Sequence, residues 1–320
     1  MLLMVGGSLT FAPTADKERR YPAPMPQLPW PLDRAPLIVA SATPLTDDGS
    51  RIDEAAVWPM VEFLVEHGAD GVFACGTTGE GILLTIGERK QVAVTFRAAV
   101  HSRLIVHCGA QTTTDTVRLA AHAAEIGADA VAVIPPPYFP LDADALTEHL
   151  VAAAQACAPL DFYIYAFTAR SGYPVPVDVV GRVADRASNL AGLKVSESPF
   201  AAVEPYLDLG LPVLVGSEPL IPPALARGAL GAVSGLAAAF PDVVRAALDQ
   251  PDASAETRLR DLRAAMEAQP FIAAIKHVLA RRGVPIRPDM RAPMRTLTAE
   301  EAVRLDASLE ALELSLRTLA

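Results

Sequence analysis

The chain has 320 residues, of which 51% are hydrophobic and 20% are charged, a composition typical of a globular protein and unlike that of a disordered one. Its 37 acidic and 27 basic side chains give a net charge of -10, and no basic block stands out. We therefore expect binding neither to nucleic acid nor to an anionic membrane surface. The sequence contains no run of 18 apolar residues, so no transmembrane helix is expected. The three cysteines lie far apart and favour a reducing, cytoplasmic location without disulfides.

Residues 1–35 are expected to form an N-terminal arm outside the main fold, because six prolines between 21 and 36 favour an extended chain. From Leu37 onward, short runs rich in Val, Ile and Leu alternate with longer amphipathic stretches. The short runs are apolar at nearly every position, which predicts strands buried on both faces of a parallel sheet. Strands are expected at Leu37–Ala42, Gly71–Ala74, Leu104–His107, Ala130–Ile134, Phe162–Ala166, Ala191–Lys194, Val213–Val215 and Ala232–Ser234. Helices are expected between them, at 53–67, 85–101, 114–126, 142–156, 176–186, 199–208, 218–227 and 239–249.

A recurring sequence motif lies between several of these helices and the strands that follow them. His-Gly-Ala-Asp-Gly-Val, Ile-Gly-Ala-Asp-Ala-Val and Arg-Gly-Ala-Leu-Gly-Ala-Val each end a helix at glycine and begin a buried strand about three residues later. Eight strands that are each followed by a helix predict a (β/α)₈ TIM barrel, an α/β fold, over residues 36–252. No Gly-x-Gly-x-x-Gly follows the first strand, so a dinucleotide-binding fold is disfavoured. Two further helices, at about 255–281 and 298–318, predict a C-terminal helical appendage over 253–320.

Lys194 is the most informative residue at the carboxyl ends of these strands, where barrels of this class carry their active sites. It closes the apolar run Ala-Gly-Leu-Lys-Val, whereas the other three lysines lie in segments that we interpret as exposed or amphipathic. Burial lowers the pKa of a lysine and supplies the neutral amine that attacks a carbonyl to form a Schiff base. The alternative is a lysine that extends from the barrel rim or pairs with Glu197 or Glu218.

Other polar residues gather at the same strand ends. Tyr165 shares a strand face with Tyr163 and lies nearer the strand's end, where it could carry a proton or serve as an ordinary aromatic. The Gly-Thr-Thr-Gly turn at 76–79 offers amides and hydroxyls that suit a carboxylate, although such a turn can also form without a ligand. Arg170 suits bidentate carboxylate recognition or an ordinary surface position. Only His107 of the six histidines ends a strand, and no metal-ligand spacing appears, so no metal is expected.

Three motifs carry a family resemblance: Gly-Thr-Thr-Gly-Glu at 76–80, Tyr-x₄-Arg-x-Gly at 165–172 and Gly-Leu-Lys at 192–194. Their joint spacing resembles the dihydrodipicolinate synthase / N-acetylneuraminate lyase superfamily, and the resemblance covers about residues 37–297. That superfamily consists of class I pyruvate-dependent aldolases on a (β/α)₈ barrel. The resemblance implies a lyase that needs no cofactor beyond a covalent Schiff base on its own lysine.

The resemblance also implies roles for individual residues. Lys194 would form the Schiff base with pyruvate or another 2-keto acid, and Tyr165 would shuttle protons to and from the adduct. Thr77 would connect Tyr165 to Tyr138, which in relatives comes from the neighbouring subunit, so a homodimer or homotetramer is expected. Substrate contacts would come from Thr78, Gly76, Arg170, Gly216, Glu218 and the carbonyl of Val233.

Three functions remain open from the sequence. The first is an aldolase or dehydratase acting on a 2-keto-3-deoxy sugar acid or a related 2-keto acid. Glu218 could accept hydrogen bonds from the hydroxyls of such a substrate. The second is dihydrodipicolinate synthase, which condenses pyruvate with aspartate semialdehyde. Arg170 supports it, whereas Ala166 and Thr168 stand where the family often has Asn and Pro. The third is a non-catalytic relative that only binds a 2-keto acid, which the presence of every catalytic residue disfavours.

Overall fold

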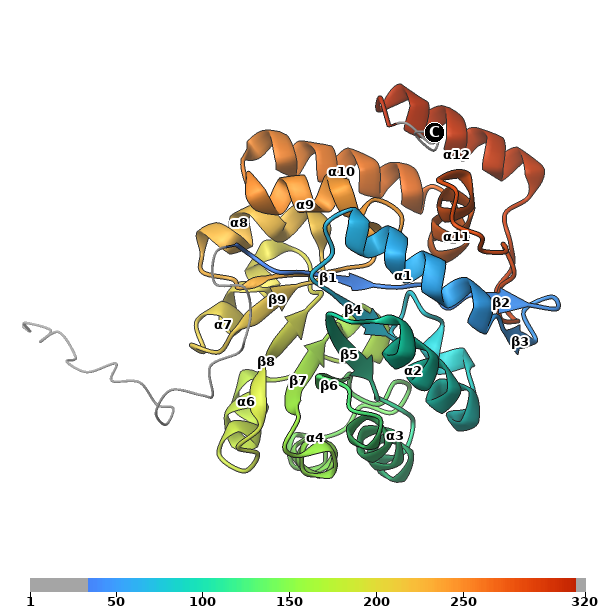
Figure 1. The fold of residues 1–320 in the computed structure, drawn as a ribbon. Helices are drawn as coiled ribbons and strands as arrows, with labels where there is room; N and C mark the ends of the chain where they lie inside the picture. The colour runs from blue at the N-terminus through green and yellow to red at the C-terminus, as the bar shows by residue number, and fades with distance from the viewer. Residues whose placement is uncertain (1–33, 315–320) are drawn as a thin grey trace, which may run out of the picture.

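The computed structural model describes residues 34–314, and eight parallel strands close into a barrel within them (Figure 1). Around the barrel the strands follow the order β1-β10-β9-β8-β7-β6-β5-β4, and β1 pairs with both β10 and β4. The predicted TIM barrel is therefore confirmed. A separate two-stranded antiparallel sheet joins β2 (Leu45–Thr46) to β3 (Arg51–Ile52). The barrel strands are β1 (Leu37–Ala40), β4 (Gly71–Ala74), β5 (Arg103–His107), β6 (Ala130–Val133), β7 (Asp161–Ala166), β8 (Leu190–Val195), β9 (Val213–Val215) and β10 (Gly231–Ser234).

Helices follow the strands and surround the barrel (Figure 1). Several begin at a side chain that caps the first turn, as at Thr85, where a capping box with Glu88 opens α2. The helices around the barrel are α1 (Val57–Glu66), α2 (Ile86–Ala99), α3 (Thr113–Glu125), α4 (Ala143–Cys157), α5 (Thr168–Ser171), α6 (Val177–Ala184), α7 (Glu204–Leu207), α8 (Ile221–Ala226) and α9 (Pro241–Asp249). None of the helices within 34–314 is long and apolar enough to cross a membrane.

The C-terminal helices differ from the sequence prediction at one point. The single helix predicted over 255–281 is wrong, because the structure has α10 (Ala253–Glu267) and then α11 (Phe271–Arg281). Pro270 lies between them, and a proline cannot donate the backbone hydrogen bond that a continuous helix needs there. Helix α12 (Ala299–Ala311) follows. Residues 1–33 of the arm predicted at 1–35 and residues 315–318 of the helix predicted at 298–318 lie outside the described residues.

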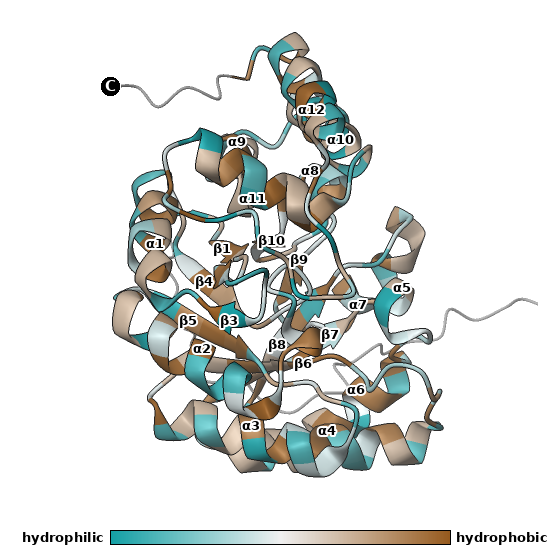
Figure 2. Ribbon diagram, turned by 90° about the vertical axis from the view of Figure 1, so that its right-hand side faces the viewer, coloured by the Kyte–Doolittle hydropathy of each residue, from teal (hydrophilic) through white to brown (hydrophobic). Residues whose placement is uncertain are grey.

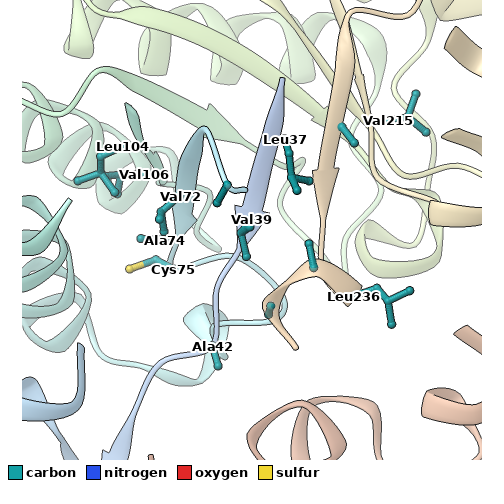
Figure 3. Close-up of a cluster of buried hydrophobic side chains, with 14 of the residues drawn as sticks. Leu37, Val39, Ala42, Val72, Ala74, Cys75, Leu104, Val106, Val215 and Leu236 are labelled. Atoms are coloured by element: carbon teal, nitrogen blue, oxygen red, sulfur yellow. The ribbon is translucent and has the colours of Figure 1, made fainter. Parts of the chain in front are cut away.

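The core has two parts because alternate residues of a strand face opposite sides. Leu37, Val39, Val72 and Ala74 point outward and pack between the strands and the helices (Figure 3). The strands at the centre are largely hydrophobic, whereas the surrounding helices carry many hydrophilic residues (Figure 2). A second cluster fills the barrel interior: Ile38, Ala40, Phe73, Ile105, Ala130, Ala132, Ile134, Tyr163, Tyr165, Ala191, Leu214 and Val233. Tyr163 and Tyr165 thus face the same way, as their spacing predicts.

Candidate active site

Lys194 lies near the end of β8, directly opposite Tyr165 of β7 in the strand register. Its side chain is only 4% exposed. The amine nitrogen is 3.9 Å from the centre of the Phe73 ring and 4.1 Å from the centre of the Tyr165 ring. Within residues 34–314, no carboxylate oxygen comes within 4.0 Å of this nitrogen. The amine is therefore held between two aromatic rings, away from the rim and without an ion-pair partner.

Burial lowers the pKa of Lys194 from 10.5 to about 7, and the negative charge of Glu218 partly opposes this shift. Near neutral pH both forms of the amine are consequently populated. The protonated form gains from the two ring faces. The neutral form has the lone pair that a nucleophile needs, so the position provides the electronic state that carbonyl attack requires.

The phenol of Tyr165 belongs to one of the two rings beside this amine and is a candidate proton carrier. Its hydroxyl is 3.5 Å from the hydroxyl of Thr77, and its side chain is 2% exposed. Burial raises the pKa of Tyr165, while the neighbouring hydroxyls of Thr77 and Ser196 lower it in part. The phenol is therefore protonated at neutral pH and able to donate its proton toward a group bound at Lys194.

The turn between β4 and α2 closes tightly on itself. The amide of Glu80 donates to the carbonyl of Thr77 at 3.1 Å, and the amide of Gly81 donates to the carbonyl of Gly76 at 3.1 Å. A Cβ on Gly81 would stand 1.9 Å from the carbonyl oxygen of Cys75, so only glycine fits. Thr78, within this turn, is 6% exposed. The amides of Glu80 and Gly81 are thus engaged within the turn itself.

Strands β9 and β10 form the opposite side of the site. A Cβ on Gly216 would lie 1.9 Å from the Ser196 hydroxyl, and one on Gly235 would lie 2.9 Å from the Thr78 hydroxyl. Val233 of β10 faces the barrel interior. The structure thus brings the ends of β8, β9 and β10 close to the 76–81 turn and to Tyr165.

Glu218 is fully buried, and hydrogen bonds engage both of its carboxylate oxygens. One oxygen accepts from the Ser234 hydroxyl at 2.8 Å and from the Leu236 amide at 2.9 Å. The other accepts from Arg263 of α10 at 2.8 Å. Glu218 therefore joins the end of β10 to α10 and acts on Lys194 through its charge, and its predicted role as an acceptor for a substrate hydroxyl stays a prediction.

Two predicted site residues lie at the surface of this single chain. Tyr138 is 82% exposed and packs edge-on against Phe139, with ring centres 4.8 Å apart. Arg170 of α5 is also exposed, with its guanidinium 5.8 Å from the centre of the Phe167 ring. Phe167 in turn lies 6.0 Å from Tyr165, ring centre to ring centre. Arg170 is thus near the mouth of the barrel, whereas Tyr138 and Tyr165 share no hydrogen bond or ring contact within residues 34–314.

Glu197 has a role that the sequence analysis missed. It was considered only as a partner for Lys194, but its carboxylate accepts from the amide and the hydroxyl of Thr168, at 2.8 and 2.9 Å. These two bonds fix the loop after β7, where Ala166 and Thr168 depart from the family's usual residues. Thr168 also begins the short helix α5, and no local pattern of the sequence pairs it with Glu197, 29 positions later.

His107 also faces the barrel interior, next to the rings that hold Lys194. Its ring centre is 5.9 Å from that of Tyr165 and 6.0 Å from that of Phe73. Its Nδ1 lies 3.1 Å from the carbonyl oxygen of Cys75, which begins the 76–81 turn. Burial lowers the pKa of His107 well below 6.5, so the imidazole is neutral. His107 follows Ile105 by two positions, so the two side chains share one face of the strand, and this spacing predicts the inward orientation of His107.

Lys276 corrects the interpretation that the other lysines lie in exposed or amphipathic segments. Its side chain is fully buried, and its amine lies 2.6 Å from Glu80.

Among residues 34–314, no group of three or more His, Cys, Asp or Glu side chains could hold a metal ion. A cavity of about 600 Å³ lies elsewhere, between α1 and the end of α11, and Phe63, His67 and Arg282 are among the residues that line it.

Comparison with known proteins agrees with this geometry. The model of the Dihydrodipicolinate synthetase family matches residues 34–312. An uncharacterized DapA-like lyase of Halobacterium salinarum is 33% identical over 300 residues, which are 90% of this chain and 97% of the relative. N-acetylneuraminate lyase of Pongo abelii is 36% identical over 207 residues, 62% of this chain and 64% of the relative.

A solved structure shares the same fold. It is a prophage protein of the dihydrodipicolinic acid synthase family from E. coli K12, in complex with pyruvate. It is 25% identical, the match covers 89% of this chain and all of the other, and the TM-score is 0.80. The matched family model, the lyases among the relatives and the closed barrel agree with one another, and the chain therefore belongs to the dihydrodipicolinate synthase / N-acetylneuraminate lyase family of lyases.

Proposed function

We propose that this lyase forms a Schiff base between Lys194 and pyruvate or a related 2-keto acid. The observation that carries the proposal is the amine of Lys194, buried between the rings of Phe73 and Tyr165 with a pKa of about 7. Buried lysines with lowered pKa values are suited to attack carbonyl carbons. The pyruvate complex of the E. coli K12 relative supports the same class of ligand.

The reaction begins when the neutral amine of Lys194 attacks the keto carbon of the substrate. The keto oxygen takes up one proton from the attacking amine and one from Tyr165 and leaves as water, so that an iminium and the Tyr165 phenolate remain. The iminium then accepts the electron pair of the bond beta to it. For a 4-hydroxy-2-keto acid this bond is C3–C4, and its cleavage releases an aldehyde as Tyr165 takes the proton of the C4 hydroxyl. Protonation of the enamine at C3 and addition of water to the iminium release pyruvate and restore Lys194.

The turn at 76–81 is the proposed binding site for the carboxylate of the 2-keto acid. The amides of Glu80 and Gly81 close the turn on itself, and the hydroxyl of Thr78 lies close to Gly235. We expect that hydroxyl and the other amides of the turn to bind the carboxylate. Gly216 and the carbonyl of Val233 would border the same substrate. Holding the carboxylate places the keto carbon next to Lys194 and supplies the proximity that an intramolecular reaction gains.

The favoured substrate is a 2-keto-3-deoxy sugar acid or a related 2-keto acid, which the similarity to N-acetylneuraminate lyase supports. A second candidate is the condensation of pyruvate with aspartate semialdehyde by a dihydrodipicolinate synthase. The position of Arg170 near the mouth favours it, because that guanidinium could bind the carboxylate of the semialdehyde. Initial rates with both kinds of substrate distinguish the two candidates.

We also propose that a second copy of the chain packs against Tyr138 and Phe139 in a homo-oligomer. These side chains are 82% and 71% exposed, unusually large values for neighbouring aromatic residues. We expect a dimer or tetramer by light scattering at micromolar concentration. Phe139→Ser is expected to shift the population toward smaller species, and a wild-type protein that is monomeric throughout would contradict this assembly.

Borohydride trapping tests the proposed function directly. The protein is incubated with pyruvate and reduced, and its intact mass and peptides are measured. We expect one reduced pyruvate on Lys194. An adduct that forms only with a 2-keto-3-deoxy sugar acid would support a larger substrate, whereas folded protein without an adduct from either ligand would overturn the proposal.

The pH dependence of trapping follows from the lowered pKa of Lys194. Only the neutral amine attacks, so the rate of adduct formation is expected to rise with pH through about 7 and then to level off. Samples are incubated at different pH values and quenched into borohydride at one fixed pH, so that the reduction step is the same for all. A rate that keeps rising to pH 10 would show that the lysine has an ordinary pKa.

A further inference from the structure

The carboxylate of Glu80, the last residue of the Gly-Thr-Thr-Gly-Glu motif, is held entirely by the C-terminal part of the chain. Its Oε1 accepts from the amine of Lys276 at 2.6 Å, across 196 positions of sequence. Its Oε2 accepts from the amide of Arg291 at 2.7 Å. The Lys276 amine also donates to the carbonyl of Asp289 at 2.6 Å. One buried ion pair thus fastens the 76–81 turn to α11 and to the segment that follows α11.

Glu80 has a backbone conformation that needs such support. Its φ is +56°, in the left-handed region that residues other than glycine rarely adopt. This conformation turns the chain after Glu80, so that the amide of Gly81 donates to the carbonyl of Gly76 and closes the turn. Both carboxylate oxygens are engaged, and the side chains of Glu80 and Lys276 are fully buried. Neither side chain can leave the pair without exposing an unpaired charge to the protein interior.

The segment after α11 contacts the neighbouring parts of the mouth as well. The side chain of Arg291 binds Glu88, which belongs to the capping box that opens α2. The carbonyl of Met290 lies so close to Gly49 that an added Cβ there would approach it to 1.9 Å. Residues 289–291 therefore contact the turn, the start of α2 and the loop between β2 and β3.

We propose that Lys276 and Glu80 are positioning residues that hold the 76–81 turn in the conformation that binds the carboxylate of the 2-keto acid. The inference rests on the proposed function and extends it, because it makes the C-terminal helices part of substrate binding. Neither residue reaches Lys194, so the pair acts on the affinity for the 2-keto acid and leaves the nucleophile intact. Other polar contacts of α11 do not reach the 76–81 turn: His277 and Arg281 both contact the carboxylate of Asp306 in α12.

The test compares variants of the full-length protein by the pyruvate concentration that half-saturates borohydride trapping and by the maximal trapping rate. Glu80→Gln keeps the size of the side chain and removes its charge. We expect a rise of about tenfold or more in the half-saturating concentration, the usual effect of losing a hydrogen bond to a charged group. The maximal rate should change much less. The control is Asp306→Asn, which should lower the melting temperature and leave the half-saturating concentration unchanged.

Lys276→Met leaves Glu80 buried and unpaired, so this variant can fail to fold. The double variant Glu80→Met/Lys276→Met removes both charges and supplies the second measurement. We expect it to fold, to retain trapping at saturating pyruvate and to need more pyruvate for half-saturation. A wild-type half-saturating concentration in Glu80→Gln and in the double variant would overturn the inference. Absence of trapping in the wild-type protein would instead overturn the proposed function.

Discussion

Lys194→Arg is expected to form no reduced pyruvate adduct and to lose catalytic turnover by a factor of about 10⁴ or more. The guanidinium keeps a positive charge near the two rings, but its pKa lies far above that of an amine, so it never supplies a neutral nucleophile. Mass spectrometry of the trapped protein and initial rates measure the two effects. An adduct on another lysine of the folded variant would assign the Schiff base elsewhere.

Lys194→Met provides the matched control, because it removes the amine and keeps the volume of the side chain. The pKa of Lys194 is lowered in the folded protein, so the unfolded chain binds more protons between pH 7 and 10.5. The cost of burying this amine is therefore fully present below about pH 7 and is relieved as the pH rises toward 10.5. We expect Lys194→Met to be more stable than the wild-type protein at pH 7, by something on the order of a few kcal/mol. That difference in free energy of unfolding should shrink at pH 9.5, and denaturant unfolding at the two pH values checks it.

Tyr165→Phe is expected to lower turnover by about 10²–10⁴-fold, the usual contribution of a general acid or base. The phenyl ring keeps its contact with the amine of Lys194, so the lysine should remain reactive. Trapping of pyruvate is therefore expected to continue at a reduced rate, while bond cleavage in the complete reaction slows much more. Rapid-quench measurement of adduct formation alongside steady-state turnover separates the two steps.

The outcome that would contradict the role of Tyr165 is a variant with wild-type turnover. Thr77→Val is a useful companion, because Thr77 contacts the Tyr165 hydroxyl at 3.5 Å and does not reach the amine of Lys194 directly. It should cost less than Tyr165→Phe. If both variants lose activity equally, the connection between the two hydroxyls matters as much as the phenol itself.

The barrel and the position of Lys194 were predictable from the sequence because both depend on local patterns. Buried parallel strands are apolar at nearly every position, and Lys194 interrupts such a run near its end. The common face of Tyr163 and Tyr165 follows from their spacing of two. The break at Pro270 was predictable in principle, since proline ends a helix, but the amphipathic pattern on either side concealed it.

The features that could not be predicted depend on partners distant in the sequence. Lys276 lies in a largely apolar helix, but its partner Glu80 is 196 positions earlier and no local pattern identifies it. Glu197 was considered only as an alternative partner for Lys194, whereas its carboxylate binds Thr168, 29 positions earlier. Hydropathy records which side chains avoid water, but it does not record which charged pairs form inside a closed fold.

The closure of the barrel has a consequence for how the chain is made. Strand β1 pairs on one side with β4 and on the other with β10, where Leu37 lies opposite Ala232. During synthesis, the ribosome must add all of the intervening residues before that second edge can be covered, which takes roughly 10 to 40 seconds at ordinary rates of translation. For that time, one edge of an entirely apolar strand remains available to other chains. The nascent protein is therefore most prone to aggregation before β10 emerges, and each interruption of translation between β4 and β10 prolongs that exposure.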